Sequence, residues 1–122
     1  MNHLAQALLV ANVLWDFVSA IAVWVCAVCE SRNFIADAHV ALWADEENRT
    51  NFAASALFAF LLVHWCCLRL VAVVLDWSQF AVWTYAMEAF LVLLMVVLGR
   101  MHEFAGCAVV VLCVLCALVV LF

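Results

Sequence analysis

Four ionisable side chains lie inside long apolar stretches of this sequence, where side chains with chemical potential are rare. Asp16, His64, Arg69 and Glu88 each interrupt a hydrophobic run, and Glu88 stands within WTYAMEAFLVLLMVVLG at 83–99. A charge at mid-bilayer costs about 2.5–3.5 kcal/mol on insertion scales, so such groups face the protein interior and pair, or mark proton relays. We interpret the four as a structural intramembrane polar network, with a proton path as the alternative.

Depth along the spans predicts which of these groups pair. At a rise of about 1.5 Å per residue, Arg69 lies about 9 Å and Glu88 about 12 Å from the DWSQ connection at 76–79. His64 lies at about 16 Å, and Asp16 at about 18 Å from the start of its own span. We therefore predict that Arg69 pairs with Glu88 and that His64 pairs with Asp16, so that the buried charges cancel locally.

Four of the seven cysteines form two C-x-x-C pairs, CAVC at 26–29 and CVLC at 113–116. Zinc and redox sites also use this spacing. Both pairs lie within apolar segments rather than at turns, and there cysteine acts as a small, weakly polar packing residue. Haem ligation by two histidines is also disfavoured, because only His64 lies deep in a span. We expect no metal site, no catalytic residue and no cofactor, with bound phospholipids as a structural component. The cysteines are Cys26, Cys29, Cys66, Cys67, Cys107, Cys113 and Cys116.

The elements that position these side chains are membrane spans. Of the 122 residues, 74% are hydrophobic and 11% charged, whereas a soluble domain is about half apolar and about a quarter charged. Four segments reach or approach the roughly 20 residues that a helical span needs: 4–29, 52–75, 80–98 and 105–122. The sequence therefore predicts an all-α integral membrane protein, a single domain of four transmembrane helices. The short second and third connections predict antiparallel neighbours.

The long first connection contains a second, smaller element. Asn33 is placed to cap a short helix over 34–43, which we expect to lie in the membrane interface. The stretch ADEENRTN after it is the most polar part of the chain, and Thr50 or Asn51 is expected to cap the second span.

The arginines predict the orientation. Arg32, Arg49 and Arg100 lie in the first and third connections, which places both termini on the outer, luminal or intermembrane side. By this topology the NRT glycosylation sequon at 48–50 faces the wrong side and we expect it to be unused. With a net charge of −5 and no lysine, the chain lacks the basic surface that nucleic acid or acidic lipid patches require.

Two short motifs carry a resemblance. RT at 49–50 opens the second span with Arg69 late in it, and WTY at 83–85 opens the third span with Glu88 further in. With its size, four spans and long first loop, the chain resembles the small four-span scaffold family of ergosterol biosynthesis in the endoplasmic reticulum over half of its length. Glu88 follows the WTY motif more closely than in that family, and the usual basic C-terminal tail is missing. The resemblance implies a non-catalytic tether that holds sterol enzymes together.

The predicted spans contain no helix-breaking residues away from their ends, which disfavours a transporter. The chain has no proline, and its two glycines stand at span ends, whereas transporters expose backbone at broken helices near the midplane. We therefore predict a non-enzymatic accessory or structural subunit of a larger membrane complex of the respiratory-chain or ATP-synthase type, acting by helix packing and lipid filling. We favour the mitochondrial inner membrane over the endoplasmic reticulum. Its expected partners are other membrane subunits and lipids, with no nucleic acid and no soluble small-molecule substrate. The alternatives are a scaffold in the endoplasmic reticulum that tethers sterol-biosynthesis enzymes, and a small proton or ion conductor that uses Asp16, His64 and Glu88.

Overall fold

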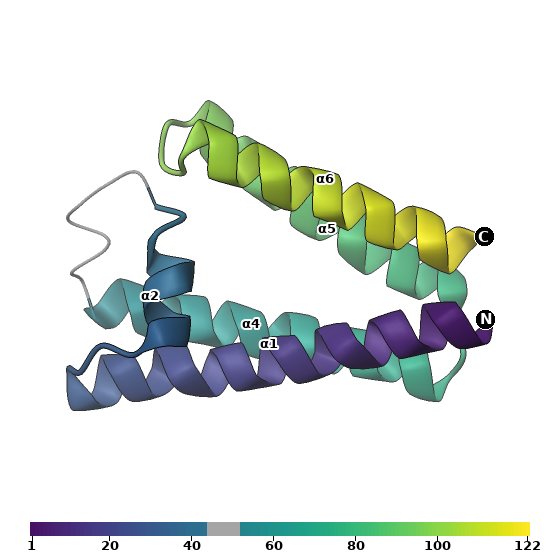
Figure 1. Cartoon of the computed structure of the whole chain (residues 1–122), viewed down its shortest axis with the longest axis horizontal. Helices are drawn as coiled ribbons and strands as arrows, with labels where there is room; N and C mark the ends of the chain where they lie inside the picture. Colours follow the sequence, from purple (N-terminus) through teal and green to yellow (C-terminus); the bar gives the residue numbers. More distant parts are fainter. Residues whose placement is uncertain (44–51) are drawn as a thin grey trace.

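The computed structural model of the chain describes residues 1–43 and 52–122 and is all-helical over these ranges (Figure 1). Four helices are long and apolar enough to cross a membrane, as the prediction of a helical integral membrane protein requires. A short helix lies between the first and second of them. The helices are α1 (His3–Cys29), α2 (Phe34–Val40), α4 (Phe52–Val74), α5 (Ser78–Val97) and α6 (Glu103–Leu121).

The bounds of the long helices lie within two residues of the segments predicted from hydropathy. Both α5 and α6 begin two residues earlier than predicted, at Ser78 and Glu103, because a polar residue is tolerated in the first helical turn. The predicted sequon at 48–50 and the predicted cap by Thr50 or Asn51 lie outside the described residues.

The short helix α2 begins as predicted and ends earlier. The Asn33 side chain accepts a hydrogen bond from the Ala36 backbone N–H at 2.8 Å, so the predicted cap is present. The helix was predicted to extend to residue 43, and this is wrong, because it ends at Val40. The chain turns there, and Trp43 instead forms a backbone bridge with Met101 in the α5–α6 connection.

The long helices are arranged as two pairs. Helix α1 packs mainly against α4, and α5 packs mainly against α6, with far fewer contacts between the two pairs. Figure 1 shows the pairs close together at the end that carries both termini and further apart at the end that carries α2. At the narrow end, the Asn2 amide donates a hydrogen bond to the Phe122 carbonyl oxygen at 3.3 Å.

Helix α2 and the residues after it link the two pairs at the wide end. The Asn33 amide donates to the Ala22 carbonyl at 2.8 Å, which ties α2 to α1. The Leu42 carbonyl accepts from the His102 backbone N–H at 2.9 Å, beside the bridge between Trp43 and Met101. The wide end is therefore held by backbone contacts with the α5–α6 connection.

The apolar core consists of two clusters, one near each end of the molecule. One cluster near the narrow end draws on all four long helices, and the other, near α2, draws on α1, α2 and α4. The polar residues described below lie between the two helix pairs, on α1, α4 and α5. The first cluster contains Ala5, Leu9, Ala72, Ala81, Tyr85, Cys113 and Val120, and the second contains Ala20, Val23, Cys26, Ala36, Ala59 and Leu62.

Candidate functional site

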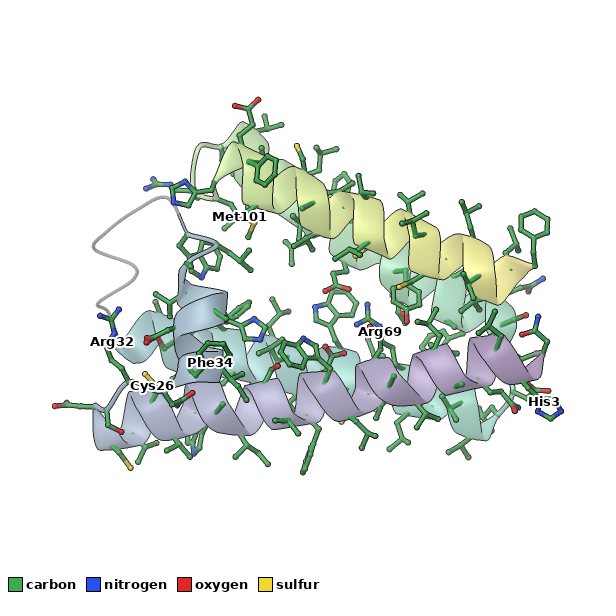
Figure 2. The ribbon with its side chains drawn as sticks, viewed as in Figure 1. His3, Cys26, Arg32, Phe34, Arg69 and Met101 are labelled. Atoms are coloured by element: carbon green, nitrogen blue, oxygen red, sulfur yellow. The ribbon has the colours of Figure 1, made fainter. Side chains whose placement is uncertain are left out.

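The polar centre of the molecule is the side chain of Arg69, late in α4. It is only 1% exposed and lies between the two helix pairs (Figure 2). Its Nη1 donates to Asp16 Oδ2 on α1 at 2.9 Å, its Nη2 donates to Glu88 Oε2 on α5, and its Nε donates to Thr84 Oγ1 at 3.4 Å. The planar guanidinium, which presents donors in a fixed fork, thus joins three helices. We call Asp16, Arg69 and Glu88 the charge cluster.

Neighbouring side chains hold the charge cluster in place. Thr84 Oγ1 donates to the Ala81 carbonyl at 2.7 Å, so that its lone pairs face Arg69. The Cζ atom of Arg69 lies 4.3 Å from the ring centroid of Tyr85 and 5.6 Å from that of Trp65, within the range of cation–π attraction. From α6, the Cys113 thiol donates to Glu88 Oε2 at 3.5 Å. All four long helices therefore contribute to the cluster.

One of the two predicted pairings is present and the other is wrong. Arg69 pairs with Glu88, as the short connection between their helices predicted. Asp16 does not pair with His64 but with the same Arg69. The His64 side chain is exposed, its Nδ1 lies 3.1 Å from the carbonyl oxygen of Phe60, and its ring packs on the Phe60 ring at 4.5 Å. His64 therefore does not belong to the intramembrane network.

His64 misses Asp16 because it lies on a different face of α4 from Arg69. Residues five apart on a helix differ by about 140° in direction at 3.6 residues per turn, so His64 and Arg69 point to different faces of α4. Depth alone suggested that His64 matches Asp16, whereas the long arginine side chain reaches across that difference in depth. Arg69 shares a face of α4 with Trp65 and Ala72, which are buried. The face of the helix, rather than depth, therefore predicts which residue of α4 meets Asp16.

The charge cluster has more negative than positive groups. Two carboxylates share one guanidinium, so the formal sum of −2 and +1 is −1. Within the described residues, hydrogen bonds from protein donors reach Oδ2 of Asp16 and Oε2 of Glu88, and none reaches the second oxygen of either carboxylate. The cluster therefore keeps free acceptor capacity.

A cavity of about 470 Å³ adjoins the charge cluster. It extends from the cluster toward α2, and its walls are mainly aromatic and aliphatic, with Trp15, Trp65 and Tyr85 among them. Two buried polar atoms on lining residues have no hydrogen-bond partner within the described part of the chain, the hydroxyl of Tyr85 and Nε2 of His39. Neither the cavity nor these two atoms were anticipated from the sequence, because they depend on the separation of the helix pairs.

His39 lies at the α2 end of this cavity. Its ring packs against the ring of Trp15 at 5.8 Å and the ring of Phe58 at 5.6 Å. Burial lowers the pKa of His39 below its ordinary value, because the charged imidazolium is desolvated there. His39 therefore favours the neutral form.

The cysteines lie free in the described structure, at positions that differ widely in burial. Cys26, Cys66 and Cys113 are buried, and Cys29, Cys67 and Cys107 are exposed. In residues 1–43 and 52–122 there is no group of three or more His, Cys, Asp or Glu side chains arranged to hold a metal ion. The Cys66 thiol approaches the Val13 carbonyl at 3.6 Å, which is a packing contact between α4 and α1.

Comparison with known proteins adds no relative. No protein-family model, no curated protein and no solved structure matches this chain. The functional argument therefore depends on the charge cluster, the cavity and the outer helix faces.

Proposed function

We propose that the chain is a non-catalytic accessory subunit of a larger membrane complex, of the respiratory-chain or ATP-synthase type, which acts by packing its helices against other subunits and lipid. The observation that carries this proposal is the surface of α6. Leucines and valines on several faces of this helix are between 46% and 59% exposed, including Val111, Leu112, Leu115 and Leu118. A helix that is apolar on all sides is normally buried inside a protein or surrounded by lipid. Because α6 is covered mainly by α5 alone, it has surface left for a partner helix.

The charge cluster supports the same proposal. It places the three charges that lie deep in the spans, Asp16, Arg69 and Glu88, between the helix pairs, where they connect α1, α4 and α5. The lipid-facing and partner-facing surfaces can then remain apolar, and the relative positions of three helices are constrained. A bundle constrained in this way can pack as one unit against other subunits of an assembly.

We further propose the finer topology. The course of the chain in Figure 1, which turns back at each connection, supports four antiparallel spans. Phe34 on α2 is 88% exposed while Ala36 and Val40 are buried on the protein side, which supports a helix lying in the interface. Arg32 and the α5–α6 connection lie at the α2 end (Figure 2), so the positive-inside rule places both termini on the opposite side. The mitochondrial inner membrane remains the favoured location and the endoplasmic reticulum the alternative.

Co-purification in mild detergent tests this function. The tagged chain is isolated and its partners are identified by mass spectrometry, with Leu115→Ala plus Leu118→Ala on α6 as the weakening variant. The control is Leu70→Ala plus Val74→Ala, on exposed positions of α4. We expect respiratory or ATP-synthase subunits with the wild type and the control, and their loss with the α6 variant. Recovery of the chain alone as a homo-oligomer would reject the proposal.

The same experiment separates the scaffold alternative. Sterol-biosynthesis enzymes in the isolate would support the tether that the family resemblance implies, and would move the location to the endoplasmic reticulum.

A small proton or ion conductor is the remaining alternative. The acids of the charge cluster support it, whereas the position of His64 on another face of α4 removes one predicted member of the path. Proton flux in liposomes that disappears in Glu88→Gln would support the conductor over the accessory subunit.

A further inference from the structure

The cavity between the two helix pairs has the size of a small-molecule site. Its volume is about 470 Å³, within the range of about 300–1,000 Å³ that ligand pockets occupy. An apolar molecule or a lipid chain of that size class fits within it.

The charge cluster at one end of the cavity lacks a positive charge. The formal sum of −1 over Asp16, Arg69 and Glu88 lies within the long apolar helices, where an uncompensated charge is costly. Arg69 directs all three of its guanidinium nitrogens to Asp16, Glu88 and Thr84. A bound cation would complete the cluster, as would a proton on one of the two carboxylates.

The free hydrogen-bonding atoms at this end are two carboxylate oxygens, which accept, and one hydroxyl, which accepts or donates. The second carboxylate oxygens of Asp16 and Glu88 receive no bond from the described residues. The Tyr85 hydroxyl is buried without a partner on a side chain that is 1% exposed, and buried hydroxyls are normally satisfied. An ammonium group brings up to three donors and one positive charge, which matches this set. An alcohol brings one donor and no charge, and a carboxylate adds a like charge.

The walls suit the rest of such a molecule. Trp15 and Trp65 line the cavity beside the charge cluster, and aromatic faces attract cations as well as apolar groups. Toward α2 the lining continues with Leu42, Phe58 and Met101, which are apolar. We propose that this cavity binds one apolar amine, with its protonated amino group against the free oxygens of Asp16 and Glu88 and its hydrocarbon body along the aromatic wall. This proposal stands independently of the accessory-subunit function.

Native mass spectrometry of the full chain, released from detergent micelles, tests the proposal with three probes of equal chain length. The probes are dodecylamine, dodecanol and dodecanoic acid. We expect saturable binding of one dodecylamine per chain, at least about tenfold tighter than dodecanol and corresponding to about 1.4 kcal/mol, and no saturable binding of dodecanoic acid. Equal affinities for the amine and the alcohol, or amine binding that never saturates, would overturn the proposal.

Two variants locate the binding. Leu91→Trp fills the cavity that Leu91 lines, and Leu93→Trp on the same helix is the matched control, because Leu93 is 47% exposed and does not line the cavity. We expect Leu91→Trp to lose the amine and Leu93→Trp to keep it. Retention by both variants would overturn the site.

The charge is tested separately. Glu88→Gln makes the charge cluster neutral, and we expect it to abolish the preference for the amine over the alcohol. The matched control, Glu103→Gln in the first turn of α6, lies outside this cavity and should keep the preference. A preference that survives in Glu88→Gln would overturn the assignment of the amino group to the charge cluster. Should Glu88→Gln fail to fold, the wild-type comparison of probes and the tryptophan pair still decide the proposal.

Discussion

Replacing Arg69 by methionine is expected to lower the free energy of unfolding by about 3–5 kcal/mol, the usual cost of leaving buried charges unpaired. The Asp16 side chain is 7% exposed and that of Glu88 is 23% exposed, and both lose the cation that they share. At an effective dielectric constant of about 20, one ion pair at about 4 Å contributes about 4 kcal/mol before desolvation is counted. Desolvation offsets part of this attraction in the folded wild type, and the unpaired acids keep that cost in the variant.

The shared arginine makes the outcome of combined variants specific. A simple pair of Arg69 and Glu88, as depth and chain connectivity predicted, would be repaired by Arg69→Met with Glu88→Met. In the charge cluster this double variant still leaves Asp16 as a buried carboxylate without a cation, so we expect only part of the stability to return. Adding Asp16→Asn removes the last of the three charges and should restore most of the remainder.

Unfolding in mixed micelles of rising SDS fraction, followed by helical circular dichroism, measures these differences. The control is Arg32→Met, because Arg32 pairs with Asp37 at 3.2 Å on the surface and such exposed pairs contribute little. Two results would refute the reasoning: an Arg69→Met variant that unfolds at the wild-type SDS fraction, or a double variant that is as stable as the triple variant.

Three further predictions concern the supporting structure. Gly106→Ala should cost about 1–3 kcal/mol, because its Cβ would lie 2.2 Å from Val96 Cγ2, and adding Val96→Ala should restore the stability in the SDS titration; a failure to restore it would reject this contact as the cause. Asn33→Ala should cost about 0.5–2 kcal/mol and speed amide hydrogen exchange in α2, because the cap to Ala36 is lost; unchanged exchange there would count against the cap. Since burial lowers the pKa of His39, folding favours the neutral ring, and this stability is lost as the pH falls through the unfolded value of 6.5 toward the lower folded value. Between about pH 7 and about pH 5, the thermal unfolding temperature should therefore fall more steeply in the wild type than in His39→Phe. Parallel curves of unfolding temperature against pH would contradict the assignment.

The spans and the cap of α2 are local properties, which is why they were predictable. Long apolar runs identify the four helices, and Asn33 provides the side-chain acceptor that starts the short one. The end of α2 was not predictable in the same way. Its last predicted turn gives way to the bridge between Trp43 and Met101, a contact between residues far apart in the chain.

Among the polar residues, too, one pairing was predictable from the sequence and another depended on helix packing. Arg69 and Glu88 stand on helices joined by a short connection, so that their pairing follows from connectivity and depth. The partner of Asp16 depends on how α1 and α4 are rotated against each other, and depth alone assigned it to His64. The structure instead turns His64 outward and brings Asp16 to Arg69.

The sequence by itself determined that the chain forms four apolar helices and that charges within them must be compensated, because hydropathy and the cost of burying charge act on each segment separately. Only the tertiary structure decided that one arginine serves two acids and that a cavity remains beside them. Both features arise from the angle and rotation between helix pairs, which are set by packing contacts among residues distant in sequence.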